Sequence, residues 1–176
     1  LEPKNRIKLL SLMNFASPYI ELPKKLTVKQ NLEVYARLYG VGTIKKRMEE
    51  LIEDLNLQKF LFKKTGELSS GQKNRVSLAK SLINKPKLLF LDEPTASLDP
   101  DVGDFVREYI EKYKKNNELT ILLASHNMKE VERLCNEVVM MKQGKIVDSG
   151  TCEELIKKHG RENLEDTFLK IARSKK

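Results

Sequence analysis

Several residue types and patterns are scarce in this sequence, and each scarcity excludes a class of protein. Tryptophan is absent, cysteine occurs only at Cys135 and Cys152, and no strictly apolar run exceeds four residues. A membrane-spanning helix needs about 20 mostly apolar residues, so we expect no direct membrane span. Two cysteines without a C-x-x-C pair make no disulfide framework, so we expect reduced structural thiols in a cytosolic protein. No charged-then-apolar leader opens the chain, so we expect no secretory signal.

The glycine-rich motif G-x-x-x-x-G-K-[ST], whose backbone cradles phosphate groups, is also absent. The one Gly-Lys pair is Gly144-Lys145, which has Val139 at the first glycine position and Ile146 at the Ser or Thr position. The sequence begins with Leu1 rather than Met. We therefore expect a piece of a longer protein.

The composition is that of a protein with a hydrophobic core. The chain has 176 residues, of which 40% are hydrophobic and 33% are charged, which argues against a disordered segment. Its formal net charge of +8 permits a nucleotide, a nucleic acid or lipid head groups as partners and does not choose among them. Most of the excess lies in scattered lysine pairs, which favours an ordinary solvated surface.

Short apolar segments alternate with helical ones along the chain, which predicts an α/β protein with a parallel sheet. We expect strands at 7–14, 87–92 and 119–124, and a hairpin of 137–142 and 145–148. Helices are expected to begin at Thr27, Thr43, Ser69 or Ser70, Asp99, Met128, Thr151 and Leu164. The stretch 28–85 carries helical patterns without strands, and we expect it to form a helical subdomain inserted beside the sheet.

Two acidic residues, Asp92 and Glu93, follow the apolar run LLFL directly. They are therefore expected at the carboxyl end of a buried strand, where open α/β sheets bind ligands. Alternation along the strand directs the two carboxylates differently, so one is able to hold Mg²⁺ through its waters while the other faces an attacking water. The alternative is a strand that merely ends in solvated acids.

The segment LSSGQ, Leu68–Gln72, predicts a turn at a helix start with hydroxyls and unpaired backbone amides. Such a turn at the positive end of a helix dipole suits phosphate, and Gly71 would let the phosphate approach the backbone. The alternative is an ordinary serine cap.

His126 follows the apolar segment LTILLA, where it is able to bridge a terminal phosphate and a water. The alternative is a loop histidine without a role.

The order LSSGQ, LLFLDEPTASLDP and ASHN resembles the ATP-binding cassette (ABC) family of transporter ATPases over residues 26–150. The three motifs resemble the family's signature, its Walker B motif with the D-loop, and its switch histidine. The resemblance implies a P-loop NTPase (ABC ATPase) fold whose N-terminal strands and phosphate loop are missing from this sequence. It implies four segments: the end of the N-terminal core lobe with a degenerate Gln-loop (1–27), the helical subdomain ending in the signature helix (28–85), the α/β hydrolysis core (86–150) and C-terminal helices (151–176).

The resemblance also implies roles for individual residues, with ATP and Mg²⁺ as cofactors. Asp92 would coordinate Mg²⁺, Glu93 would polarise the attacking water and His126 would contact the γ-phosphate. The signature residues would contact ATP held by a second cassette, and two D-loop residues would lie across that dimer interface. These interface residues are Leu68, Ser69, Ser70, Gly71 and Gln72 in the signature, and Ser97 and Asp99 in the D-loop.

The same resemblance implies an ATPase subunit of a membrane exporter, peripheral on the inner face of the cell membrane and paired with a transmembrane permease. The segments LTVKQNLEVYARLYGV and GKIVDSGTCEELIKKHG look like those of export-type cassettes. Two departures stand against it. The phosphate loop is absent, so we expect weak hydrolysis by this chain alone, and Ala16 and Ser17 stand near the place of the family's Gln-loop glutamine.

Two other functions remain open. The first is a soluble cassette protein that acts on the ribosome or on nucleic acid, which would fit the positive charge. The export-like tail weighs against it, and we therefore expect no nucleic-acid partner. A non-catalytic regulatory cassette fragment would fit the absent phosphate loop.

Overall fold

The computed structural model describes residues 3–18 and 20–173, so the ends of the expected segments 1–27 and 151–176 lie outside the described residues. The chain consists of two compact units that divide between Ala124 and Ser125. We describe each unit by itself.

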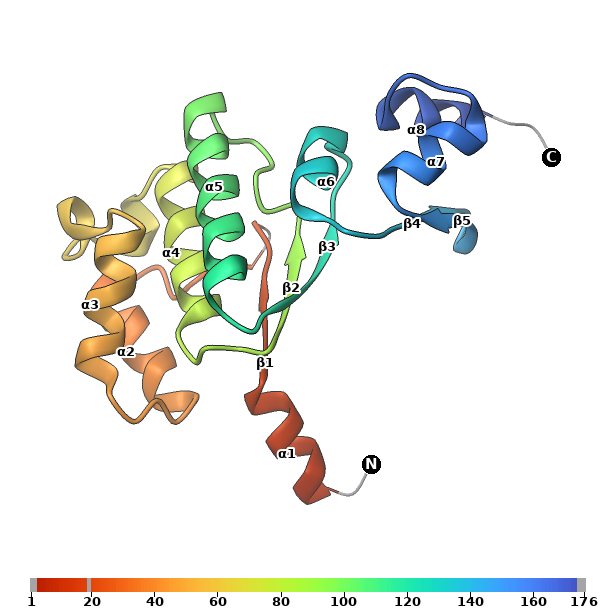
Figure 1. Ribbon diagram of the computed structural model, residues 1–176. Helices are drawn as coiled ribbons and strands as arrows, with labels where there is room; N and C mark the ends of the chain where they lie inside the picture. Colours follow the sequence, from red (N-terminus) through yellow and green to blue (C-terminus); the bar gives the residue numbers. More distant parts are fainter. Residues whose placement is uncertain (1–2, 19, 174–176) are drawn as a thin grey trace. The chain divides into compact units, whose positions relative to one another are not determined.

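The first unit contains a three-stranded parallel sheet and five α-helices among its described residues (Figure 1). Its helices are α1 (Pro3–Ser11), α2 (Val28–Leu38), α3 (Ile44–Asp54), α4 (Ser70–Leu82) and α5 (Pro100–Asn116), with short 3₁₀ turns η1 (Gln58–Phe60) and η2 (Thr65–Glu67). Its strands are β1 (Met13–Ala16), β2 (Leu88–Asp92) and β3 (Thr120–Ala124).

The strand expected at 7–14 is wrong for most of its length, because α1 extends to Ser11 and β1 begins only at Met13. The segment is rich in leucine and lysine, which favour helix, and contains a single β-branched residue. Pairing with β2 begins where the backbone amides of Lys87 and Leu88 donate to the carbonyl of Leu12. The tertiary pairing, rather than the local apolar run, therefore decides where the strand starts.

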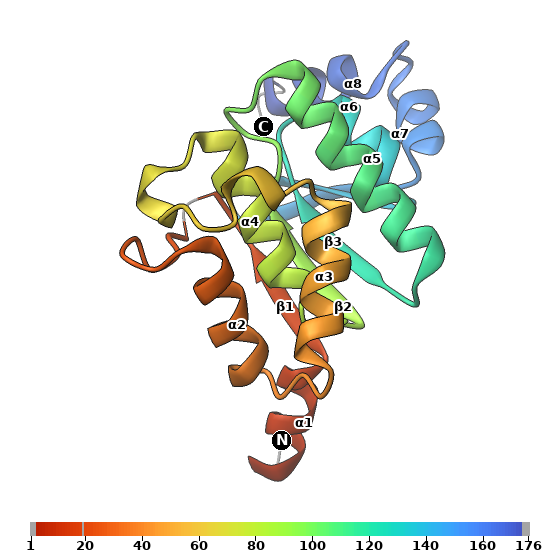
Figure 2. The same cartoon turned by 90° about the vertical axis from the view of Figure 1, so that its left-hand side faces the viewer.

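The sheet order is β1-β2-β3, with β2 in the centre, and every pair is parallel. Figures 1 and 2 show α4 and α5 covering one face of the sheet. The residues that point to this face in β2, Leu89 and Leu91, are each 1% exposed. This covered face forms the core of the first unit.

The strand expected at 119–124 is present as β3, but one of its faces is exposed. Leu122 is 60% exposed, and it stands in register with Phe90 and Phe15 on the face opposite the buried Leu89 and Leu91. Strand β3 is at the edge of the three-stranded sheet. The sequence pattern fits a strand covered on both faces, whereas the described residues cover one of them.

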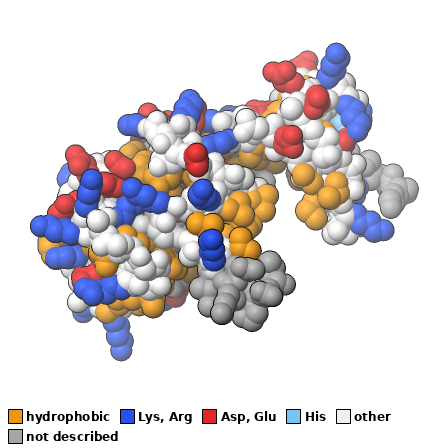
Figure 3. Space-filling model, turned by 60° about the horizontal axis from the view of Figure 1, so that its bottom comes forward, with side chains coloured by type: hydrophobic (Ala, Val, Ile, Leu, Met, Phe, Trp, Pro, Cys, Tyr) orange, Lys and Arg blue, Asp and Glu red, His pale blue; other side chains and the backbone are white. Residues whose placement is uncertain are grey.

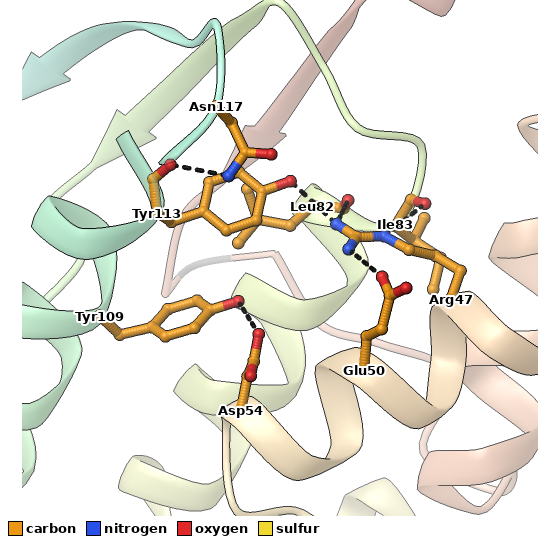
Figure 4. Close-up of polar contacts among 8 residues, drawn as sticks. All are labelled: Arg47, Glu50, Asp54, Leu82, Ile83, Tyr109, Tyr113 and Asn117. Carbon is orange, nitrogen blue, oxygen red and sulfur yellow. Dashed lines mark hydrogen bonds and ion pairs between the residues drawn. The ribbon is translucent and has the colours of Figure 1, made fainter. Parts of the chain in front are cut away.

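The helical segment is attached to the core by Arg47 of α3, which is 5% exposed (Figure 4). Its guanidinium donates to the carbonyl of Leu82 at 2.7 Å and to that of Ile83 at 3.4 Å, at the carboxyl end of α4. It also donates to the Tyr113 hydroxyl of α5 at 2.9 Å and pairs with Glu50 at 2.9 Å. One buried cation thus satisfies carbonyls at a helix end and joins three helices.

The second unit contains α6 (Met128–Leu134), the antiparallel hairpin β4 (Val138–Lys142) and β5 (Lys145–Gly150), α7 (Cys152–His159) and α8 (Leu164–Arg173). Its core is formed by Val131, Met140, Leu155 and Leu164. Cys135 and Cys152, which form no disulfide, pack against this core partly buried. The helix starts expected at Thr27 and Thr151 are confirmed, and each residue forms a capping box, with Gln30 and Glu154 as the partners.

The surface mixes hydrophobic and basic side chains (Figure 3). Large apolar side chains such as Leu38 and Phe62 are exposed, with the ammonium of Lys29 5.8 Å from the centre of the Phe62 ring. Within residues 3–18 and 20–173, none of the helices combines the length and the apolar character needed to cross a bilayer.

Candidate functional site

The carboxyl ends of β1 and β2 bring Ser17 and Asp92 together. Ala16 pairs with Leu91, so the next residue of each strand reaches the same edge of the sheet. The Ser17 hydroxyl donates to Oδ2 of Asp92 at 3.1 Å. Ser17 is 4% exposed and Asp92 is partly buried. The position expected for Asp92 at a strand end is thus present, with a buried hydroxyl holding one carboxylate oxygen.

Glu93 begins a sharp turn directly after the strand. Its φ of 50° lies in the left-handed region, which non-glycine residues adopt at a cost. Two backbone bonds hold this conformation: the Glu93 amide donates to the Ala124 carbonyl at 2.8 Å, and the Ala96 amide donates to the Glu93 carbonyl at 3.0 Å. The Ala124 carbonyl of β3 and the turn to Ala96 therefore both fix the backbone of Glu93.

The loop after Glu93 leads to α5 and contains two of the expected interface residues. Ser97 has a φ of 58° and is exposed, as is Asp99. Asp99 occupies the expected N-cap position and Pro100 the first helical position, but the Asp99 side chain makes no capping hydrogen bond. The Asn74 side chain of α4 donates to the carbonyl of Pro94 at 2.6 Å. This contact attaches the loop to the helix that follows the LSSGQ segment.

The LSSGQ segment forms the start of α4. Ser69 is the N-cap, and its hydroxyl accepts the Gln72 amide while the Gln72 side chain accepts the Ser69 amide. Leu68 is buried, whereas Ser69 and Ser70 are exposed. At Gly71 an added Cβ would lie 3.1 Å from Val102 Cγ1, so α5 leaves little room for a larger residue there. This close packing supplies a structural reason for Gly71 that the sequence reasoning missed.

A pocket of about 380 Å³ lies beside these elements, between the segment that follows β1, the start of α4 and the loop before α5. Ser17 lines it together with Leu68, Ser70 and Ser97, so the residue that holds Asp92 also borders the LSSGQ and D-loop segments. Lys73 of α4 contributes a basic group to the wall. Sequence reasoning did not find this pocket, because the segment after β1 has no regular pattern.

His126 belongs to the second unit, where it is exposed in the turn before α6. The neighbouring Ser125 hydroxyl donates to Glu130 at 2.6 Å, and the Asn127 side chain accepts the Glu130 amide at 3.3 Å. These bonds cap α6 and fix the turn that carries His126. The first unit holds all the other candidates by itself: residues 68–72, Asp92, Glu93, Ser97 and Asp99.

The oxygen donors at Asp92 suit a hard cation. Among the described residues no three His, Cys, Asp or Glu side chains gather to form a protein metal cage. Mg²⁺ does not need one, because it binds through one or two carboxylates, waters and substrate phosphates. A carboxylate with one oxygen held by a hydroxyl therefore fits Mg²⁺ and would not fit a structural zinc ion.

Solved structures give the class of protein that this fold defines. A structure described as the ATP binding subunit of an ABC transporter aligns with 96% of this chain and 71% of its own, with a TM-score of 0.84 and 22% identity. A dimeric ATP-binding cassette, bound to ADP and phosphate after hydrolysis, aligns with 86% of this chain and 68% of its own at a TM-score of 0.75 and 22% identity. The fold is therefore the α/β P-loop NTPase fold of ABC ATPase subunits, as the resemblance implied.

Sequence comparison gives the family. The family described as ABC transporter matches residues 7–96, just over half of the chain. The chain is also 34% identical over 147 residues to the ABC transporter ATP-binding protein NatA of Bacillus subtilis, covering 82% of this chain and 59% of NatA. The chain belongs to the ABC transporter family.

Other relatives differ in the direction of transport that their names state. A Nod factor export ATP-binding protein of Rhizobium is 37% identical over 78% of this chain and 46% of its own length. A methionine import ATP-binding protein of Shouchella clausii is 36% identical over 82% of this chain and 42% of its own. The chain spans about half the length of the curated relatives it matches.

Proposed function

We propose that the chain is part of an ATP-binding and ATP-hydrolysing subunit that powers an ABC membrane exporter. The observation that carries this proposal is the edge of the sheet, where Asp92, held by Ser17 at 3.1 Å, is followed directly by Glu93 in a fixed turn. Family membership supplies ATP as the nucleotide.

In this proposal the two acids have separate roles. Mg²⁺, when bound, neutralises charge on the transferring phosphoryl group. Asp92 holds it through the carboxylate, and Glu93 accepts a hydrogen bond from the attacking water and polarises it. His126 contacts the γ-phosphate from the turn before α6. Catalysis consists of positioning and charge stabilisation.

The remaining residues act across a dimer of cassettes. The LSSGQ segment, with Leu68 packed beneath, presents the Ser69 and Ser70 hydroxyls and the backbone at Ser70 and Gly71 to ATP held by a second subunit. The Gln72 side chain and amide close the capping box that holds this turn. Ser97 and Asp99 lie in the D-loop at the same interface. Their exposure in the first unit supports this role, because interface residues must be accessible before the dimer closes.

The proposed organisation follows the four segments given by the motifs. Residues 28–85 form the helical subdomain that docks on a transmembrane permease, 86–150 form the hydrolysis core, and 1–27 and 151–176 flank them. The subunit acts in the cytoplasm at the inner face of the membrane. The export-type tail and the relative named for Nod factor export favour export over import.

Two matched capping residues test the interface role of the LSSGQ segment. Ser69 and Thr27 each form a capping box, on α4 and on α2. Replacing either with alanine should lower the free energy of unfolding by about 1 kcal/mol, because a helix cap is lost. Only Ser69→Ala should weaken ATP-driven dimerisation, measured by sedimentation of the chain together with whatever native sequence adjoins it.

Equal effects of Ser69→Ala and Thr27→Ala on dimerisation would reduce Ser69 to an ordinary helix cap and contradict the proposed interface. Wild-type protein that neither binds ATP nor dimerises would favour the regulatory fragment instead.

A further inference from the structure

Ser17 lies near the place where the resemblance leads one to expect a glutamine, and its hydroxyl contacts Asp92. We propose that Ser17 is a positioning residue that orients the Asp92 carboxylate toward the divalent cation. This inference rests on the proposed function, because it assumes that Asp92 holds the cation.

The contact is well placed for this role because it uses only one of the two carboxylate oxygens. Ser17 donates to Oδ2, which fixes the rotation of the carboxylate plane and directs Oδ1 away from the serine. A hydroxyl that donates to a carboxylate makes a charge-assisted bond, and this one is 3.1 Å long. Ser17 is 4% exposed, so water competes poorly for this bond. The carboxylate therefore adopts one preferred orientation before any cation arrives.

The backbone that carries Ser17 is itself held from two sides. The Lys80 ammonium of α4 donates to the carbonyl of Phe15, two residues before Ser17, at 3.2 Å. After the strand, the Ile20 amide donates to the Ser17 carbonyl at 3.3 Å. Together with the pairing of Ala16 and Leu91, these bonds fix the position of the hydroxyl relative to Asp92.

The Ser17 side chain acts on Asp92 directly. Ser17 borders the pocket that Ser70 and Ser97 also line, and its hydroxyl contacts the Asp92 carboxylate without an intervening group. Residues that hold a metal-binding carboxylate commonly change metal affinity by about 10- to 100-fold when they are removed. We expect removal of the Ser17 hydroxyl to change cation affinity to this extent. The effect would act through Asp92 rather than through contact with the reacting phosphate.

The test is Mn²⁺ binding to the full chain in the presence of ATP, monitored by paramagnetic broadening of the backbone amide resonances. In the wild-type chain, Mn²⁺ should broaden the resonances of Asp92 and Glu93. Ser17→Ala should shift this broadening to a Mn²⁺ concentration about 10-fold higher, while Ser17→Thr, which keeps the hydroxyl, should restore it. Ser81→Ala is the matched control, because Ser81 is also buried but donates to the Leu78 carbonyl within α4.

Asp92→Asn separates failure of this inference from failure of the proposed function. If Asp92→Asn abolishes the broadening and Ser17→Ala leaves it unchanged, the positioning role of Ser17 is overturned while the role of Asp92 stands. If Asp92→Asn leaves the broadening unchanged, or the wild-type chain shows none, both are overturned. An equal loss in Ser17→Ala and Ser81→Ala would also overturn the inference, since the effect would then be one of stability.

Discussion

At the scale of single residues, the turn after β2 is conformationally costly. Glu93 and Ser97 adopt φ values of 50° and 58°, and a non-glycine residue in this region costs of the order of 1 kcal/mol. Costly backbone conformations persist where the surrounding structure fixes them, and here the Ala124 carbonyl and the turn to Ala96 do so. The residue proposed to polarise water is thus placed by a strained turn.

Replacing Glu93 by glycine and by alanine should separate this strain from the loss of the carboxylate. Both variants remove the same side-chain interactions, but only glycine adopts positive φ without steric cost. We expect Glu93→Gly to be more stable than Glu93→Ala by about 1 kcal/mol in denaturant unfolding. Equal stability of the two variants would show that the turn is not strained.

The sequence predicted the place of Asp92 but not the turn at Glu93. Asp92 follows from an apolar run that ends in an acid, a local pattern. The conformation of Glu93 depends on a carbonyl at Ala124, which belongs to another strand. The contact of Ser17 with Asp92 was likewise out of reach, because it follows from the register of two strands distant in the chain.

At the scale of elements, one face of the sheet is covered by helices and the opposite face is exposed in part. Leu91 in the central strand is 1% exposed, whereas Leu122 in the edge strand is 60% exposed. Leu91→Ala should lower the free energy of unfolding by about 2–5 kcal/mol, because it leaves a cavity. Leu122→Ala should change it by about 0.5 kcal/mol or less in the same denaturation experiment. Comparable losses would mean that the face carrying Leu122 is covered in solution.

Strand β5 and helix α7 are joined by the carboxylate of Asp148. Lys158 and His159 each reach it at 2.7 Å, and these hydrogen bonds lower the pKa of Asp148 from 3.8 to about 2. Because this pKa is depressed in the folded state, its stabilising contribution is complete above about pH 4 and is lost as the pH falls toward 2.

We therefore expect amide-exchange protection of α7 to decrease between about pH 4 and pH 2, and Asp148→Asn to remove this part of the pH dependence. If Asp148→Asn keeps the wild-type pH dependence, other carboxylates are its cause.

Helix starts were predictable because capping is local: Thr27, Ser69 and Thr151 each carry their capping partner three residues later. The boundary between α1 and β1 was not predictable, because a leucine-rich segment is compatible with a helix or a strand. Hydrogen bonding to β2 determines which of its residues form the strand. The exposed face of β3 was not predictable either, because an apolar run does not tell which of its faces another element covers.

At the scale of the whole molecule, the chain carries motifs of an ABC ATP-binding domain on two compact units, with Asp92 and Glu93 in one and His126 in the other. Its formal net charge is +8, and the face drawn in Figure 3 carries basic, acidic and hydrophobic side chains together. The proposed reaction needs both units and, across the dimer, a second cassette.

The most direct test of this account is Mg²⁺-dependent ATP turnover by the chain together with whatever native sequence adjoins it, compared between the wild type and Glu93→Gln. The account predicts that Glu93→Gln retains ATP binding while kcat falls by about 10²- to 10⁴-fold, because glutamine keeps the shape of the side chain and loses the carboxylate that polarises water. Turnover unchanged by Glu93→Gln would contradict the account.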